Sequence, residues 1–143
     1  MGDTVAKTIA TKKEMYNLIE QIEAIGEEIL ALKGVIGLVF YSRNGDIISV
    51  KSNIETAHWV VPKTSDEIER KSLICGEMIC EIASEISAFG KLEAVTILHE
   101  KRCSFLIPLN ELCLGITANK TVEVSQMIRK VKKIIKKYMI GML

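Results

Sequence analysis

Residues 32–45, LKGVIGLVFYSRNG, combine the longest apolar run of the chain with a turn sequence. Residues 35–41 are apolar at every step, so both faces of a strand here must be covered, which predicts a central position in a sheet. Asn44-Gly45 supplies two residues that tolerate positive φ, as a tight hairpin turn requires. Residues 47–50 then predict a shorter returning strand at a sheet edge.

A helix is predicted before this run, over residues 12–33. Its apolar residues recur at alternating steps of three and four, the spacing of one helical stripe, and are Met15, Leu18, Ile22, Ile25, Ile29 and Leu32. Thr11 and Glu14 form a capping box at its start, and Gly34 ends it. Gly26 lies inside the helix at a cost of about 1 kcal/mol relative to alanine, which indicates close packing there.

Residues 52–63 show no clear periodicity and contain the chain's single tryptophan, Trp59. This segment is either a partner-binding loop or a lid that packs over the sheet, since a lone Trp commonly fills a gap in its own fold.

Ser65 caps a second long helix, predicted over residues 66–89. Ile74 and Met78 widen its apolar stripe on one shoulder, so its apolar arc is broader than a single sheet contact needs. Three acidic residues follow one another at i, i+4 spacing on its polar face, which is typical of a solvated helix surface: Glu77, Glu81 and Glu85.

Three strands follow Gly90 in quick succession, over residues 92–98, 103–109 and 112–118. Their separators are of hairpin length, so the three strands should form an antiparallel meander.

A last helix is predicted over residues 122–138, with Val124, Ile128, Val131, Ile135 and Tyr138 on its apolar side. It carries one acid, Glu123, and six bases: Arg129, Lys130, Lys132, Lys133, Lys136 and Lys137. These bases are either the solvated side of the helix or a surface for an acidic partner, anionic lipid or nucleic acid. Nucleic acid is the least favoured of these, because no aromatic residues are interleaved.

The length and net charge of the chain indicate a single domain that is not a globally basic nucleic-acid binder. The 143 residues carry 19 Lys and Arg against 18 Asp and Glu, a net charge of +1, which excludes a globally basic nucleic-acid binder. We expect an N-terminal arm over residues 1–11, a single domain over 12–139 and a tail over 140–143. No apolar run is long enough to cross a bilayer and no export signal is visible, so we expect a cytoplasmic protein without an integral membrane segment.

Catalytic and cofactor motifs are sparse, so we expect neither an enzyme nor a bound metal or cofactor. There is no glycine-rich nucleotide loop, and the four cysteines show no C-x-x-C spacing, as expected of reduced, buried thiols. His99 and Cys103, across a short turn, are the one pair that could serve an enzyme.

Residues 32–45 resemble the roadblock / dynein light chain domain family. A helix ending in Gly34-Val35, a glycine at Gly37 and Ser42-x-x-Gly45 at the hairpin carry the likeness. The later segments agree in order, with Ala-Val-x-Ile at 94–97, Phe-Leu-Ile-Pro-Leu at 105–109 and Leu-x-Leu-Gly-Ile at 112–116. The resemblance spans roughly residues 15–138.

This resemblance implies an α/β fold of the α+β type, in the order α-β-β-α-β-β-β-α, with a profilin-like, five-stranded antiparallel sheet. The second helix would lie on one face of the sheet and the terminal helices on the other. Family members typically pair through their third strands and second helices. Carried onto this chain, the dimer interface would comprise Ile74, Met78, Glu81, Leu92, Ala94, Val95, Thr96 and Ile97.

In function, the resemblance implies a non-catalytic dimeric scaffold or regulator that docks a Ras-like small GTPase, paired with itself or a paralogue. Trp59, Glu77 and Glu85 are the candidate partner contacts. The alternative is a small-molecule sensor of PAS- or GAF-like architecture, since a sheet flanked by helices also encloses ligands in those modules.

Overall fold

The structure, a computed structural model, describes residues 17–42, 46–53, 82, 85 and 87–139. A helix over residues 17–30 opens the described chain, and the other elements are β1 (Val35–Ser42), β2 (Ile47–Ser52), the 3₁₀ turn η2 (Ser87–Phe89), β3 (Val95–Leu98), β4 (Arg102–Leu109), β5 (Leu112–Asn119) and α4 (Val124–Tyr138). The helix cap at Thr11, the turn at Asn44-Gly45, the Trp59 segment, and the arm and tail lie outside these residues.

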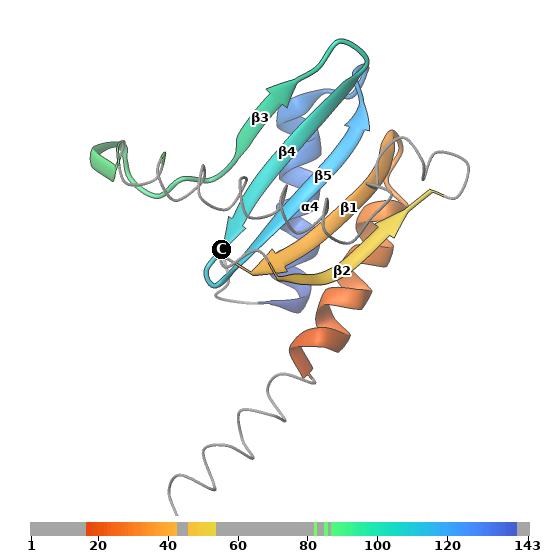
Figure 1. The fold of residues 1–143 in the computed structure, drawn as a ribbon, viewed down its shortest axis with the longest axis vertical. Coiled ribbons are helices and arrows are strands. Elements are labelled where there is room, and N and C mark those ends of the chain that lie inside the picture. Colours follow the sequence, from red (N-terminus) through yellow and green to blue (C-terminus); the bar gives the residue numbers. More distant parts are fainter. Residues whose placement is uncertain (1–16, 43–45, 54–81, 83–84, 86, 140–143) are drawn as a thin grey trace, which may run out of the picture.

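The strands form one antiparallel sheet in the order β2-β1-β5-β4-β3 (Figure 1). The predicted five-stranded antiparallel sheet is therefore confirmed. As its apolar sequence predicts, β1 lies inside the sheet, between β2 and β5. β2 and β3 are the two edge strands.

One face of the sheet carries the main core, which both terminal helices cover (Figure 1). Five helix side chains are completely buried in it: Ile22, Ile25 and Ile29 of the first helix, and Val131 and Ile135 of α4. The expectation that the terminal helices share a face is confirmed. Met127, which the predicted stripe of the last helix omitted, is also buried there.

The opposite face of the sheet holds a second buried cluster of Tyr41, Leu106 and Cys113. The helix expected on this face lies mostly outside the described residues. Of it, Ile82 and Glu85 are helical, and its end at residues 87–89 is a 3₁₀ turn. Gly90, at φ +99°, follows this end, as the sequence predicted.

β3 is shorter than predicted, because residues 92–94 are not part of the strand. Val95 pairs with Leu106, and the next hydrogen-bonded pair of that ladder would join Glu93 to Pro108. Proline has no N–H to donate, so the ladder stops at Val95.

Gly34 connects the first helix to β1 in a conformation that excludes other residues. Its φ is +93°, and a Cβ built at this position would lie 2.5 Å from Cγ1 of Val122. The residue therefore needs both the left-handed backbone and the absence of a side chain.

We expect Gly34→Ala to lower the free energy of unfolding by about 2 kcal/mol or more, because it adds a clash with Val122 to the backbone strain. Gly90→Ala is the matched control, since Gly90 also has positive φ but no atom within 4 Å of the built Cβ. Urea unfolding of both variants measures the difference. Equal losses would show that the contact with Val122 costs nothing.

Candidate functional site

The outer edge of β3 offers unpaired backbone groups. The N–H of His99 donates to the carbonyl of Arg102 at 2.9 Å, which marks 99/102 as a hydrogen-bonded pair. Hydrogen-bonded pairs alternate in an antiparallel ladder, so residues 97 and 95 also bond to β4. The N–H and C=O groups of Thr96 and Leu98 therefore point away from β4, toward an edge where no strand of the described chain pairs.

The side chains along β3 alternate as its pleat requires. Val95 and Ile97 are half-buried against the second cluster, whereas Thr96 and Leu98 are exposed on the other side. Leu98 is 68% exposed. The interface predicted from the sequence ends at Ile97, although alternation from Thr96 places Leu98 on the same side.

β3 contains no charged residue, in contrast to the other edge strand. β2 carries Lys51, and edge lysines are a common protection against strand addition. Of the two edges, β3 is therefore the one whose composition permits pairing with another chain.

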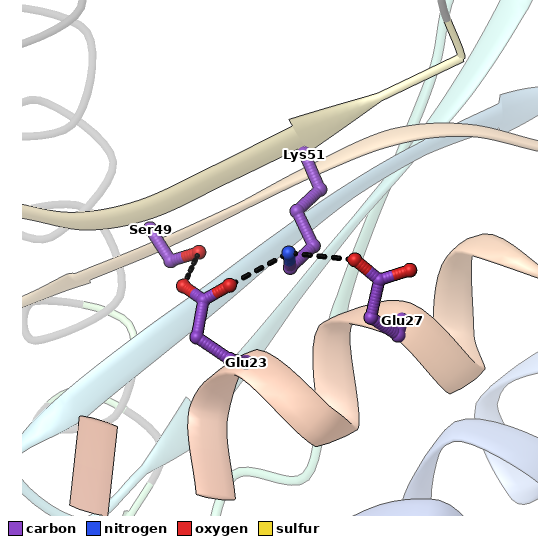
Figure 2. Close-up of polar contacts among 4 residues, drawn as sticks. All are labelled: Glu23, Glu27, Ser49 and Lys51. Atoms are coloured by element: carbon purple, nitrogen blue, oxygen red, sulfur yellow. Dashed lines mark hydrogen bonds and ion pairs between the residues drawn. The ribbon is translucent and has the colours of Figure 1, made fainter. Parts of the chain in front are cut away.

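Lys51 also ties β2 to the first helix, as Figure 2 shows. Its Nζ lies 2.7 Å from a carboxylate oxygen of Glu23 and 2.9 Å from one of Glu27. The hydroxyl of Ser49 donates to the other oxygen of Glu23 at 2.8 Å. Hydrogen bonds from Lys51 and Ser49 lower the pKa of Glu23, and those to the two glutamates raise the pKa of Lys51.

Gly26 makes room for this contact. A Cβ at Gly26 would lie 2.8 Å from Cδ of Lys51, so the lysine stem crosses the helix where no side chain stands. The close packing that the sequence predicted at Gly26 is thereby explained. The cluster is a structural tie between strand and helix, because every charge in it has a partner within it.

The predicted dimer-interface and partner-contact residues fall into three groups. Val95, Thr96 and Ile97 lie on β3, while Leu92 and Ala94 precede the strand and pack half-buried against the cores. Glu85 is exposed and helical. The remaining candidates lie outside the described residues: Trp59, Ile74, Glu77, Met78 and Glu81.

His99 and Cys103 do not form a catalytic pair. His99 Nε2 lies 3.2 Å from the Ser104 hydroxyl, and no hydrogen bond joins it to Cys103. Cys103 is 1% exposed within the main core, and its burial raises the pKa of the thiol. A raised pKa disfavours the thiolate, which is the reactive form.

No helix among the described residues has the length and apolar character needed to cross a membrane.

Comparison with known proteins relates the chain to others through its fold. No protein-family model matches it, and no curated protein does. Three of the solved structures that match are a Roadblock/LC7 domain from Streptomyces avermitilis, MglB from Myxococcus xanthus, and an MglB in a tetrameric arrangement. The Streptomyces domain is 11% identical at a TM-score of 0.61, covering 79% of this chain and 90% of that one.

The Myxococcus protein is 10% identical at a TM-score of 0.66, covering 87% and 92% of the two chains. The tetrameric MglB is 11% identical at a TM-score of 0.57, covering 84% and 90%. At such identities the likeness concerns the fold, and this chain has the Roadblock/LC7 fold.

We expect Lys51→Met to lower the free energy of unfolding at neutral pH by about 1 kcal/mol, since both glutamates are largely exposed and their charges are screened. The pKa of Glu23 is lowered in the folded state, so its share of stability is present above the ordinary carboxylate range and is lost as pH falls through the folded pKa. Lys51→Met should flatten this acid-side loss. Urea midpoints measured from neutral to acidic pH test it, with Lys101→Met as control, and parallel curves for Lys51→Met and the wild type would contradict it.

Proposed function

We propose that this chain is a non-catalytic scaffold that pairs with a second copy, or with a paralogue, and docks a Ras-like small GTPase to modulate its nucleotide cycle or localisation. The observation that carries the proposal is the uncharged outer edge of β3, which no described strand pairs, with its exposed Leu98.

Pairing of two β3 edges would satisfy the outward groups of Thr96 and Leu98 in each copy. A two-fold axis makes such an interface self-complementary, because the same residues meet on both sides. Four-residue strands alone make a small contact, so further surface is needed to reach the roughly 800 Å² per partner of specific dimers. We assign that surface to the predicted second helix, to Ile74 and Met78 of its broad apolar arc together with Glu81.

Two further considerations support an assembly. An MglB of the same fold has been solved in a tetrameric arrangement, although that is a property of that protein. The family resemblance of residues 32–45 implies both the pairing mode and the GTPase. Trp59, Glu77 and Glu85 are the proposed contacts with the GTPase.

The scaffold would act on the GTPase by position. The sequence suggests no arginine finger, and phosphoryl transfer depends chiefly on how the reacting groups are placed and on the electrostatics around them. Ordering the GTPase's own switch groups would thus be sufficient to change its cycle.

The small-molecule sensor gains no support from the main core. Sensor modules hold ligands between sheet and helices, and here Phe40, Phe105 and Val131 are completely buried in one continuous cluster in that layer.

We expect Thr96→Pro to convert a dimer of about twice 15.9 kDa into a 15.9 kDa monomer. Proline at 96 removes a donor from the free edge and leaves the β3–β4 ladder intact, because the N–H of Thr96 points away from β4. Thr96→Val, which keeps the donor, is the matched control and should remain dimeric. Light scattering at micromolar concentration measures both masses. A monomeric wild type, or a dimeric Thr96→Pro variant, would refute pairing through β3.

We expect immobilised wild-type protein to retain a small GTPase from source-cell extract in one nucleotide state, at least about tenfold above the other, a preference of about 1.4 kcal/mol. Extracts loaded with a non-hydrolysable GTP analogue or with GDP provide the two states, and mass spectrometry identifies the GTPase. The Thr96→Val bait should retain it and the Thr96→Pro bait should not. Absence of any GTPase from the wild-type bait would contradict the docking role.

A further inference from the structure

The outer side of α4 concentrates positive charge that the rest of the described chain does not neutralise. The helix contains six bases and no acid. Two of the bases are paired, Lys132 with Glu93 and Lys137 with Glu28, each at 3.1 Å. The other four form no ion pair with a described residue, and they are Arg129, Lys130, Lys133 and Lys136.

Helix stability does not explain this arrangement. Bases in the last turn favour the helix dipole, which accounts for Lys136 and Lys137. Arg129, Lys130 and Lys133 lie further inside, where like charges three or four residues apart repel one another. In the described chain, Lys51 shows the opposite pattern, with two carboxylates bound to one base.

The bases border an apolar groove at the seam between α4 and the turn that follows the first helix. The groove has a volume of about 280 Å³ and is lined by Leu32, Ile134, Lys130, Lys133 and Lys137. Leu32 and Ile134 are half-buried and supply its apolar surface. The lysines follow i, i+3, i+7 spacing, so they lie along one side of the helix over roughly 10 Å.

One of the lysines that line this groove, Lys137, already binds a carboxylate. Glu28, from the first helix, binds Lys137, and the Tyr138 hydroxyl and the Lys137 ammonium lower the pKa of Glu28. The chain itself thus provides an example of how an acid is received at this surface.

We propose that this groove binds an acidic peptide segment of a partner protein, with an apolar side chain against Leu32 and Ile134 and flanking carboxylates on Lys130 and Lys133. An apolar floor bordered by lysines on one side is complementary to that chemistry. None of the groove residues belongs to β3, so this inference does not rest on the proposed function.

A peptide fits the groove better than a membrane surface does. Helices that lie in a bilayer interface insert their apolar face, whereas Met127, Val131 and Ile135 of α4 are buried in the core. The apolar residues that remain, Leu32 and Ile134, are half-buried beside the lysines, where a protruding side chain of a partner can contact them.

The test uses two fluorescein-labelled octapeptides, one of six glutamates and two leucines, the other with serines in place of the leucines. Fluorescence anisotropy with the full chain should show the leucine peptide binding at least about threefold more tightly, the gain of a partly buried aliphatic side chain. Raising the salt from about 0.05 M to about 0.3 M should weaken it, since rim charges are screened.

The variant Lys130→Glu/Lys133→Glu should weaken leucine-peptide binding at least about tenfold through the reversed contacts. Lys91→Glu/Lys101→Glu makes the same change in net charge at exposed positions away from the groove and should bind like the wild type. Circular dichroism confirms that each variant is folded.

Three results would overturn the inference. The wild type could fail to bind the leucine peptide, the two peptides could bind equally, or the two double variants could lose affinity equally. A wild type that sediments with phosphatidylserine vesicles but does not bind the leucine peptide would assign the surface to lipid headgroups.

Discussion

The pairing of β1 with β5 is the constraint on which the remaining structure depends. It joins strands separated by about half the chain, with Leu38 opposite Ile116 and Phe40 opposite Leu114. These side chains share one face, and the first helix and α4 bury them together. A shift of one residue would turn every one of them to the other face, so burial fixes the register. The chain then cannot place β3 beside β1, and β2 and β3 become the two edges.

The two edge strands, β2 and β3, differ in their charge and in how they are held to the rest of the fold. β2 is held to the first helix by Lys51, which forms ion pairs with Glu23 and Glu27. β3 begins only at Val95 because of Pro108, and its four residues carry neither a charge nor a bulge. Since an exposed strand edge is a template for another strand, this asymmetry favours addition of a strand on one side only. The proposed scaffold role follows from that asymmetry together with the family resemblance.

The helix layer and the β3 edge would then serve separate contacts. β3 lies at the end of the sheet, whereas the lysine-bordered groove lies along α4, which covers the main core (Figure 1). A scaffold with two such surfaces could hold a GTPase through its paired form and an acidic segment through each copy. Binding at one surface does not require contacts at the other, so the two would be additive unless the partners touch.

The family resemblance of residues 32–45 implied the shared face of the terminal helices. The sequence by itself determined the order of the described elements, the interior position of β1 and the edge position of β2. These features follow from local periodicity and from residues with special backbone requirements, such as Gly34. Only the tertiary structure decided where β3 begins, because that depends on Pro108 opposite it in the ladder. The tertiary structure also decided the contact of Lys51 with the first helix and the groove beside Leu32, because each joins residues far apart in the chain. It likewise set the orientation of Cys103, which is buried away from His99. Periodicity describes which face a residue occupies, but not which distant residue it meets there.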